Sequence, residues 1–143
     1  MSYNFGAKNE ERLNLAFRYG NIIGIILTGV SIAVLWLFPS QVLTIFNASP
    51  AMLSFGVPAL RIMCISYVFA SIATMVASLM QSTKRVGFSL LINVLRQLGL
   101  LLPFMWILSG IFGMDGIWYA FIAAEVITAA ISWILYRKYP VKF

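Results

Sequence analysis

Four long apolar runs, each bounded by polar or turn-forming residues, dominate the hydropathy pattern of the chain. They cover residues 20–38, 50–81, 87–109 and 117–136. A helix of about 20 residues crosses the roughly 30 Å hydrocarbon core of a bilayer, because each residue adds about 1.5 Å. The pattern therefore predicts an all-α membrane protein with four transmembrane helices in one membrane domain, residues 1–143. The second run is long enough for its first turns to extend beyond the bilayer.

The segments between these runs are short and polar or rich in turn-forming residues. Residues 1–19 are charged and are expected to form a short amphipathic helix at the membrane surface. Residues 39–49 form an uncharged connection with a short apolar piece. GIFGMDG, at residues 110–116, predicts a tight loop. Residues 137–143 form a basic tail.

Prolines mark expected features of the second and third spans. Ser49 followed by Pro50 is typical of a helix N-cap with proline at the first helical position. Pro58 predicts a bend near the membrane interface. Pro103 predicts a kink whose freed carbonyl must be satisfied by neighbouring groups. Neither span is therefore expected to be straight.

Composition supports lipid rather than water as the solvent. Hydrophobic residues make up 62% of the chain and charged residues 10%, with a mean hydropathy of +0.94. A soluble domain carries about 25% charged residues, and no soluble fold of this length could bury so much apolar surface. A soluble domain is therefore excluded.

The sequence offers little for enzyme chemistry. It has no histidine, which removes the usual metal ligand and proton shuttle, and Cys64 is the only cysteine. No nucleophile–base pair, metal-ligand cluster or phosphate-binding loop is found. The basic residues are not massed into a nucleic-acid surface. We therefore expect no enzyme activity, metal, cofactor or nucleic-acid partner.

The net charge of +6 is distributed asymmetrically. Four spans put residues 1–19, 82–86 and 137–143 on one side of the membrane, and the connections 39–49 and 110–116 on the other. The first side holds eight of the ten basic residues, namely Lys8, Arg12, Arg18, Lys84, Arg85, Arg137, Lys138 and Lys142. The other side holds no lysine or arginine. The positive-inside rule therefore predicts that both termini are cytoplasmic.

Small residues recur every four positions in the second and fourth spans. The two sets are Ser66, Ala70, Thr74 and Ser78, and Ala120, Ala124, Thr128 and Ser132. Each set lies on one helix face and favours close packing between helices. Either set could instead line an aqueous cavity.

Two charged residues lie well inside the spans. Arg96 is nine residues from the inner edge of the third span, and Glu125 is nine residues from the outer edge of the fourth. Their depths then differ by only a few ångström in a core of about 30 Å, so an Arg96–Glu125 contact is geometrically feasible. Asn93 and Gln97 could add hydrogen bonds to Arg96. These four residues are the transport-path candidates, since embedded ionisable groups indicate function. The alternative is that Arg96 reaches the interface and Glu125 is neutral in a polar cleft.

Three sequence blocks resemble the multidrug and toxic compound extrusion (MATE) transporters. The opening SYNFGAKNEER resembles the segment that closes the eighth span of that family, with matches at Tyr3, Asn4, Gly6, Ala7, Asn9 and Arg12. LLINVLRQLGLLLP, at residues 90–103, looks like the eleventh span, and FGMDGIWYAFIAAE, at 112–125, looks like the start of the twelfth. The chain thus resembles spans nine to twelve, about two-thirds of the C-terminal lobe.

The resemblance implies an antiporter that exports organic cations or drugs in exchange for Na⁺ or H⁺, by alternating access of two lobes. It implies a multi-pass protein of the plasma membrane, which is the inner membrane in bacteria. Spans nine to eleven contain no acidic residue here, so no coupling-ion site is expected in this chain. Because two lobes are needed, we expect a fragment that is inactive without an N-terminal lobe or a partner chain.

Three other functions remain open at the level of sequence. The first is a lipid-linked oligosaccharide flippase of the same superfamily. The second is a four-span small multidrug transporter that works as a dimer. The third is a structural membrane assembly protein in which Arg96 and Glu125 form a purely structural pair.

Overall fold

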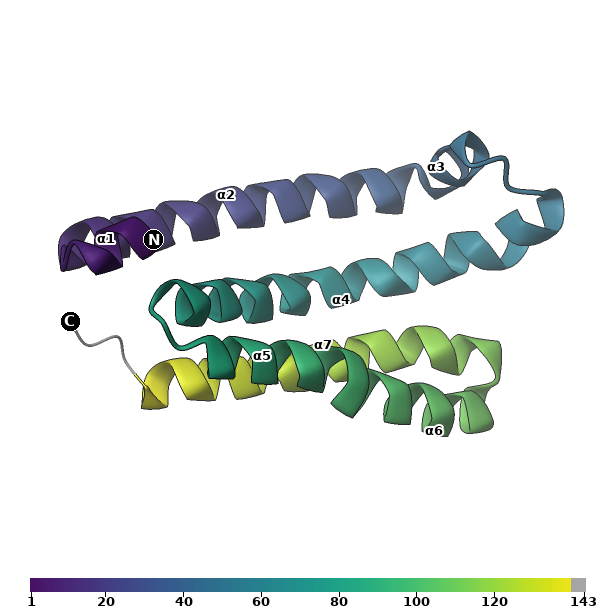
Figure 1. Ribbon diagram of the computed structural model, residues 1–143. Coiled ribbons are helices and arrows are strands. Elements are labelled where there is room, and N and C mark those ends of the chain that lie inside the picture. Colours follow the sequence, from purple (N-terminus) through teal and green to yellow (C-terminus); the bar gives the residue numbers. More distant parts are fainter. Residues whose placement is uncertain (140–143) are drawn as a thin grey trace.

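The computed structural model describes residues 1–139, and this part of the chain is helical with short turns (Figure 1). The elements are α1 (Ser2–Gly6), α2 (Glu10–Leu37), α3 (Pro39–Ile45), α4 (Pro50–Ser82), α5 (Val86–Val94), the π-helix η1 (Leu95–Leu101), α6 (Leu102–Phe112) and α7 (Met114–Lys138). Because α5, η1 and α6 form one continuous rod, four rods are long and apolar enough to cross a membrane. The predicted all-α fold with four spans is confirmed.

The first two long helices begin at side-chain caps. The Asn9 side chain accepts a hydrogen bond from the backbone N–H of Arg12 at 2.9 Å, and this cap starts α2. The Ser49 hydroxyl accepts from the N–H of Met52 at 3.2 Å, with Pro50 at the start of α4. These bonds satisfy N–H groups that have no partner within the helix. The predicted cap at Ser49 is confirmed.

The prediction of a separate surface helix within residues 1–19 is wrong. Residues 10–19 continue without a break into the first span, and only the short α1 precedes them. The chain turns between these two helices at Lys8, where φ is +52°. No glycine or proline lies between Glu10 and Tyr19, so nothing in this stretch ends the helix.

The connections at the far end of the bundle are also more helical than predicted. The 39–49 connection contains α3. The expected loop at 110–116 reduces to Gly113, whose φ of +62° suits glycine, because α6 runs to Phe112 and α7 starts at Met114. The two helices then come so close that a Cβ at Gly116 would overlap the carbonyl of Leu108. The glycines therefore permit a tight helix–helix turn rather than a loop.

The third rod changes its hydrogen-bonding pattern just before Pro103, where the sequence predicts a kink. The π-helix η1 ends at Leu101, two residues before Pro103. Proline has no N–H to donate to an upstream carbonyl, which favours a local departure from the α-helical pattern. The rod thus carries a widened turn in its middle, and Arg96 lies in that turn.

The core lies between α4 and the last two rods. Ala73, Val76, Ala77 and Met80 of α4 are buried together with Ile92 of α5. The small residues predicted on α7 are all buried, with Ala120, Ala124, Thr128 and Ser132 no more than 1% exposed. They form the seam between α7 and its neighbours, so this set serves packing.

Helix α2 lies on the other side of α4 from this core (Figure 1). Leu13 is its only buried residue. Where the helices approach, a Cβ at Gly20 would lie 3.3 Å from the end of the Met75 side chain of α4. A small residue on α2 therefore meets a long, flexible one on α4, and most of the α2 surface stays exposed.

Candidate functional site

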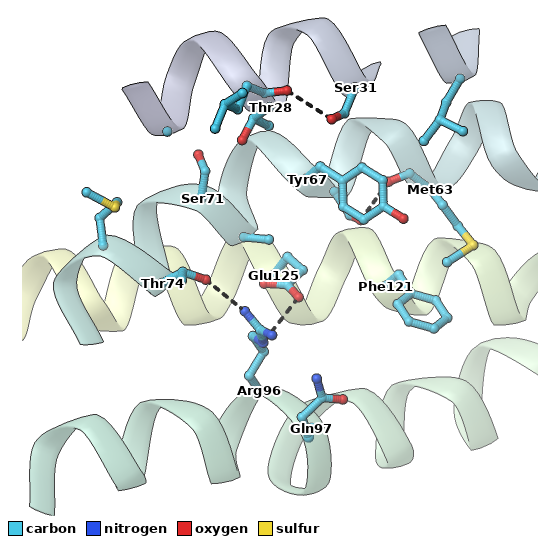
Figure 2. A pocket seen from close by; sticks show the side chains of 16 residues that line it. Thr28, Ser31, Met63, Tyr67, Ser71, Thr74, Arg96, Gln97, Phe121 and Glu125 are labelled. Carbon is cyan, nitrogen blue, oxygen red and sulfur yellow. Dashed lines mark hydrogen bonds and ion pairs between the residues drawn. The ribbon is translucent and has the colours of Figure 1, made fainter. Parts of the chain in front are cut away.

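An open groove of about 740 Å³ lies between part of α2 and the rest of the bundle. Its walls come from α2, α4, η1 and α7 (Figure 2). The polar and charged side chains on these walls are Thr28, Ser31, Ser66, Tyr67, Ser71, Thr74, Arg96, Gln97 and Glu125. Apolar side chains such as Met63 and Phe121 complete the lining. The volume lies within the roughly 300–1,000 Å³ of typical small-molecule sites.

Arg96 links three rods at the wall of this groove. Its Nε lies 3.5 Å from Oε1 of Glu125 on α7, and its Nη1 donates a hydrogen bond of 3.2 Å to Oγ1 of Thr74 on α4 (Figure 2). The side chains of Arg96 and Glu125 are 23% and 12% exposed. The structure thus brings together the two embedded charges that the sequence places at similar depths.

The ion pair leaves hydrogen-bonding capacity unused. Nε of Arg96 and Oε2 of Glu125 are both buried without a hydrogen-bond partner among the described residues. The 3.5 Å separation within the pair exceeds the usual range for a hydrogen bond. A buried carboxylate oxygen without a donor is energetically unfavourable, so Oε2 has an open position for a proton or a cationic group.

The two predicted amide neighbours of Arg96 behave differently. Gln97 lines the groove beside Arg96 (Figure 2). The Asn93 side chain donates to the carbonyl of Ser89, one turn earlier in its own helix, at 2.9 Å. No hydrogen bond joins either amide to Arg96 in the described part of the chain, so that prediction is wrong. A short asparagine side chain reaches the carbonyl four residues back more readily than a partner on a neighbouring turn.

Thr74 is a contact of Arg96 that the sequence analysis did not predict. The signal was the stripe of small residues on α4, of which Ser66, Ala70 and Thr74 line the groove. The corresponding stripe on α7 is buried in the seam. The same four-residue spacing therefore lines a cavity along part of α4, where Ser66 is itself buried, and packs a seam along α7.

The predicted family-motif residues lie at the start of the chain. Asn9 caps α2, and the Asn4 side chain donates to the carbonyl of Arg12 at 3.1 Å. Tyr3, Gly6 and Ala7 belong to α1 and the turn that follows it. None of the motif residues lines the groove. In this chain the motif builds the turn that leads into the first span.

Comparison with known proteins supports this fold. The family model MatE matches residues 1–107, a range that contains Arg96 but not Glu125. An outward-facing multidrug resistance MATE family transporter of the MOP superfamily has a TM-score of 0.86 and 22% identity, with 96% of this chain and 31% of that chain covered. A second solved structure, described as protein A, has a TM-score of 0.86 and 29% identity, with 97% and 31% covered. The comparison with curated proteins finds no match.

The chain therefore spans about a third of the length of the solved structures that it matches. Its four rods superpose on their helices over nearly all of its own length. The family match covers about three-quarters of the 143 residues. This multi-pass, membrane-embedded chain belongs to the MatE family of transporters.

Proposed function

We propose that this chain is the C-terminal part of a cation-coupled antiporter that exports organic cations in exchange for Na⁺ or H⁺. Family membership supports transport, and one solved relative is described as a multidrug resistance transporter. The observation that carries the proposal is the buried, unpartnered Oε2 of Glu125 beside a groove of about 740 Å³. A groove of this size that combines one carboxylate with hydroxyl-bearing and apolar side chains suits a lipophilic cation.

Glu125 is the transport-path residue in this proposal. The other three acidic residues, Glu10, Glu11 and Asp115, lie in the first turns of α2 and α7. A cationic substrate that reaches Glu125 competes with Arg96 for the carboxylate, and so does a proton. Thr74 holds the other side of the Arg96 guanidinium, so Arg96 keeps one partner when Glu125 is occupied. Mutually exclusive occupancy of one carboxylate is a physical basis for exchange, and this role of Glu125 departs from the expectation that the chain holds no coupling-ion site.

The remainder of the transporter is supplied by another polypeptide segment. Alternating access requires two bodies that move about a shared site, and this chain spans about a third of its solved relatives. Its partners are therefore an N-terminal lobe or a partner chain, together with the lipid bilayer. The transporter resides in the plasma membrane with both termini of this chain cytoplasmic, in line with the charge asymmetry. Alone, the chain does not catalyse exchange.

Binding of tetraphenylphosphonium, a lipophilic cation, tests the role of Glu125. The purified chain in lipid nanodiscs is expected to bind the radiolabelled cation, and Glu125→Gln is expected to weaken binding at least about tenfold, since a buried charge interaction is lost. Glu10→Gln, which removes an exposed carboxylate at the end of α2, is the matched control. Equal binding by the wild-type and Glu125→Gln chains would contradict the proposal.

A structural role for the ion pair is the second candidate. Arg96 contacts both α4 and α7, which is the arrangement expected of an assembly contact. In that case Glu125→Gln lowers folded yield and thermal stability, whereas the cation-binding role predicts a folded variant that has lost binding. Transport of labelled cation into liposomes by the chain alone would contradict the proposal that it needs a second lobe.

A further inference from the structure

A second groove, about 700 Å³ in volume, lies between α2, α4 and α7. It lies on the opposite side of the α2–α4 contact from the first groove. Its walls are almost wholly apolar and include the rings of Phe17, Phe69, Trp133 and Tyr136. The only polar amide on its wall, Asn21, donates to the carbonyl of Phe17 in its own helix at 2.9 Å. The groove therefore offers mainly apolar contact area, and the Trp133 indole N–H and the Tyr136 hydroxyl are the other polar groups on its wall.

One end of the groove is aromatic and cationic. The rings of Phe17 and Tyr136 stack with centroids 6.0 Å apart, and those of Trp133 and Tyr136 lie 5.7 Å apart. The guanidinium of Arg137 lies 5.4 Å from the centre of the Trp133 ring, so a positive charge adjoins the groove wall. Arg18 follows Phe17 directly in α2 and is exposed.

The charge around this end of the bundle is strongly positive. Basic residues here are Lys8, Arg12, Arg18, Lys84, Arg85, Arg137 and Lys138, while the acidic residues are Glu10 and Glu11. The ends of the different rods meet here, because the ring of Phe88 in α5 lies 4.8 Å from that of Tyr139. An open apolar groove that leads to a cluster of cations complements a molecule with an apolar tail and an anionic head.

We propose that this groove binds an anionic phospholipid, with one acyl chain along α2 and α7 and the phosphate at Arg18 and Arg137. The aromatic end of the groove lies at the depth of the headgroup region, where tryptophan and tyrosine are favoured. Arg137 holds the phosphate through a charge-assisted contact while its guanidinium stays over Trp133. This lipid site does not depend on the transport role of Glu125, which lines the other groove.

Fluorescence quenching by brominated lipids tests the site through Trp133. Variants that retain one tryptophan each are made, one with Trp133 alone and one with Trp36 alone, and placed in bilayers. Brominated phosphatidylglycerol is expected to quench Trp133 at least about fivefold more effectively at low mole fraction than brominated phosphatidylcholine, since even one arginine near the surface contributes about that factor. Trp36, at the opposite end of α2, is expected to show no headgroup preference.

Substitutions then separate the two parts of the site. Arg18→Gln with Arg137→Gln is expected to abolish the preference for the anionic lipid at Trp133. Ala130→Phe fills the groove and is expected to lower the efficiency with which both lipids quench Trp133. Ala33→Phe, at an exposed alanine outside both grooves, is expected to leave the quenching efficiency unchanged. Circular dichroism and gel filtration show that each variant is folded.

Two results would overturn the lipid site. Equal quenching of Trp133 by the two lipids would show that bulk lipid, with no held headgroup, faces the groove. Weak quenching by both lipids would show that lipid does not occupy the groove, and disulfide cross-links between chains that carry Ala130→Cys would identify a second copy as the occupant.

Discussion

Helices α7 and α2 both lie along α4, but they contact it in opposite ways. On α7, four small residues at four-residue spacing are no more than 1% exposed and form a closed seam. On α2, Leu13 is the only buried residue, and the nearest α4 side chain to Gly20 is the long Met75. Met75 lines both large grooves, one on each side of this contact. Small side chains thus close one interface, whereas one large side chain keeps the other open.

This difference indicates that the closed seam positions the site residues, whereas α2 forms a loosely packed wall of the groove. The α4–α7 seam, together with the third rod, fixes the positions of Thr74, Arg96 and Glu125. Helix α2 forms the opposite wall of the groove and contributes Thr28 and Ser31. Because α2 buries little surface, it is the rod that can shift at the lowest energetic cost. The predictions below compare the closed seam with the open contact, beginning with the largest effect.

The turn at the end of the seam should be the most sensitive point. Gly116→Val places side-chain atoms where the carbonyl of Leu108 lies, so α6 and α7 must separate. We expect a loss of about 3 kcal/mol or more in unfolding free energy, or no folded protein. The measurement is unfolding in mixed micelles. Gly110→Ala, at a helical glycine with nothing within 4 Å, should be neutral or slightly stabilising, and a similar loss there would refute the close-contact explanation.

The two stripes of small residues should respond differently to enlargement. Ala124→Leu overpacks the seam and is expected to cost about 1–3 kcal/mol. Ala70→Leu projects into the first groove, so it should change unfolding free energy by less than about 0.5 kcal/mol while reducing groove volume. Thermal unfolding of the two variants side by side gives the comparison. Equal losses would mean that the α4 stripe is also a packing surface.

Removing one partner of the Arg96–Glu125 ion pair should lower the unfolding free energy more than removing both partners. Arg96→Met leaves Glu125 as an uncompensated, largely buried charge and is expected to lower stability by about 1–3 kcal/mol, less than for a fully buried pair because Arg96 is 23% exposed. Adding Glu125→Leu should recover most of this loss. A double variant that is as unstable as the sum of the single variants would show that the two charges are not coupled.

The open contact between α2 and α4 should tolerate truncation of the Met75 side chain. Met75→Ala removes a side chain between two grooves rather than from a closed core, so we expect a loss of about 1 kcal/mol, below the 2–5 kcal/mol usual for such a substitution in a core. Met80→Ala, at a fully buried methionine of the same helix, provides the matched comparison and should fall in the higher range. Similar values for the two variants would argue that α2 is packed as tightly as α7.

Much of the fold could be predicted from sequence because its main determinants are local. Run length and hydropathy are enough to define four spans, and Ser49-Pro50 has the chemistry of a helix start. That Arg96 and Glu125 could meet followed from the helical rise, the span edges and the thickness of the bilayer. These inferences need only the solvent and the geometry of an isolated helix.

The remaining features depend on how the rods pack, which one sequence does not reveal. The π-helical turn around Arg96 is a choice of hydrogen-bond register near Pro103. The turn at Gly113 depends on whether α6 and α7 come close enough to need no loop. The two small-residue stripes have the same pattern, yet only their neighbours decide which one lines a cavity. Asn93 shows the same limit, since its side chain bonds to the backbone carbonyl of Ser89 and not to Arg96.

The most direct test of the proposed transport role is chemical labelling of Glu125 with a hydrophobic carbodiimide, which modifies protonated carboxyl groups in apolar surroundings. Mass spectrometry of the chain in nanodiscs is expected to locate the adduct at Glu125 and to show that tetraphenylphosphonium slows its formation in a concentration-dependent way. Unchanged labelling of Glu125 at saturating cation, or labelling confined to Glu10 and Glu11, would contradict the claim that this carboxylate binds the transported cation.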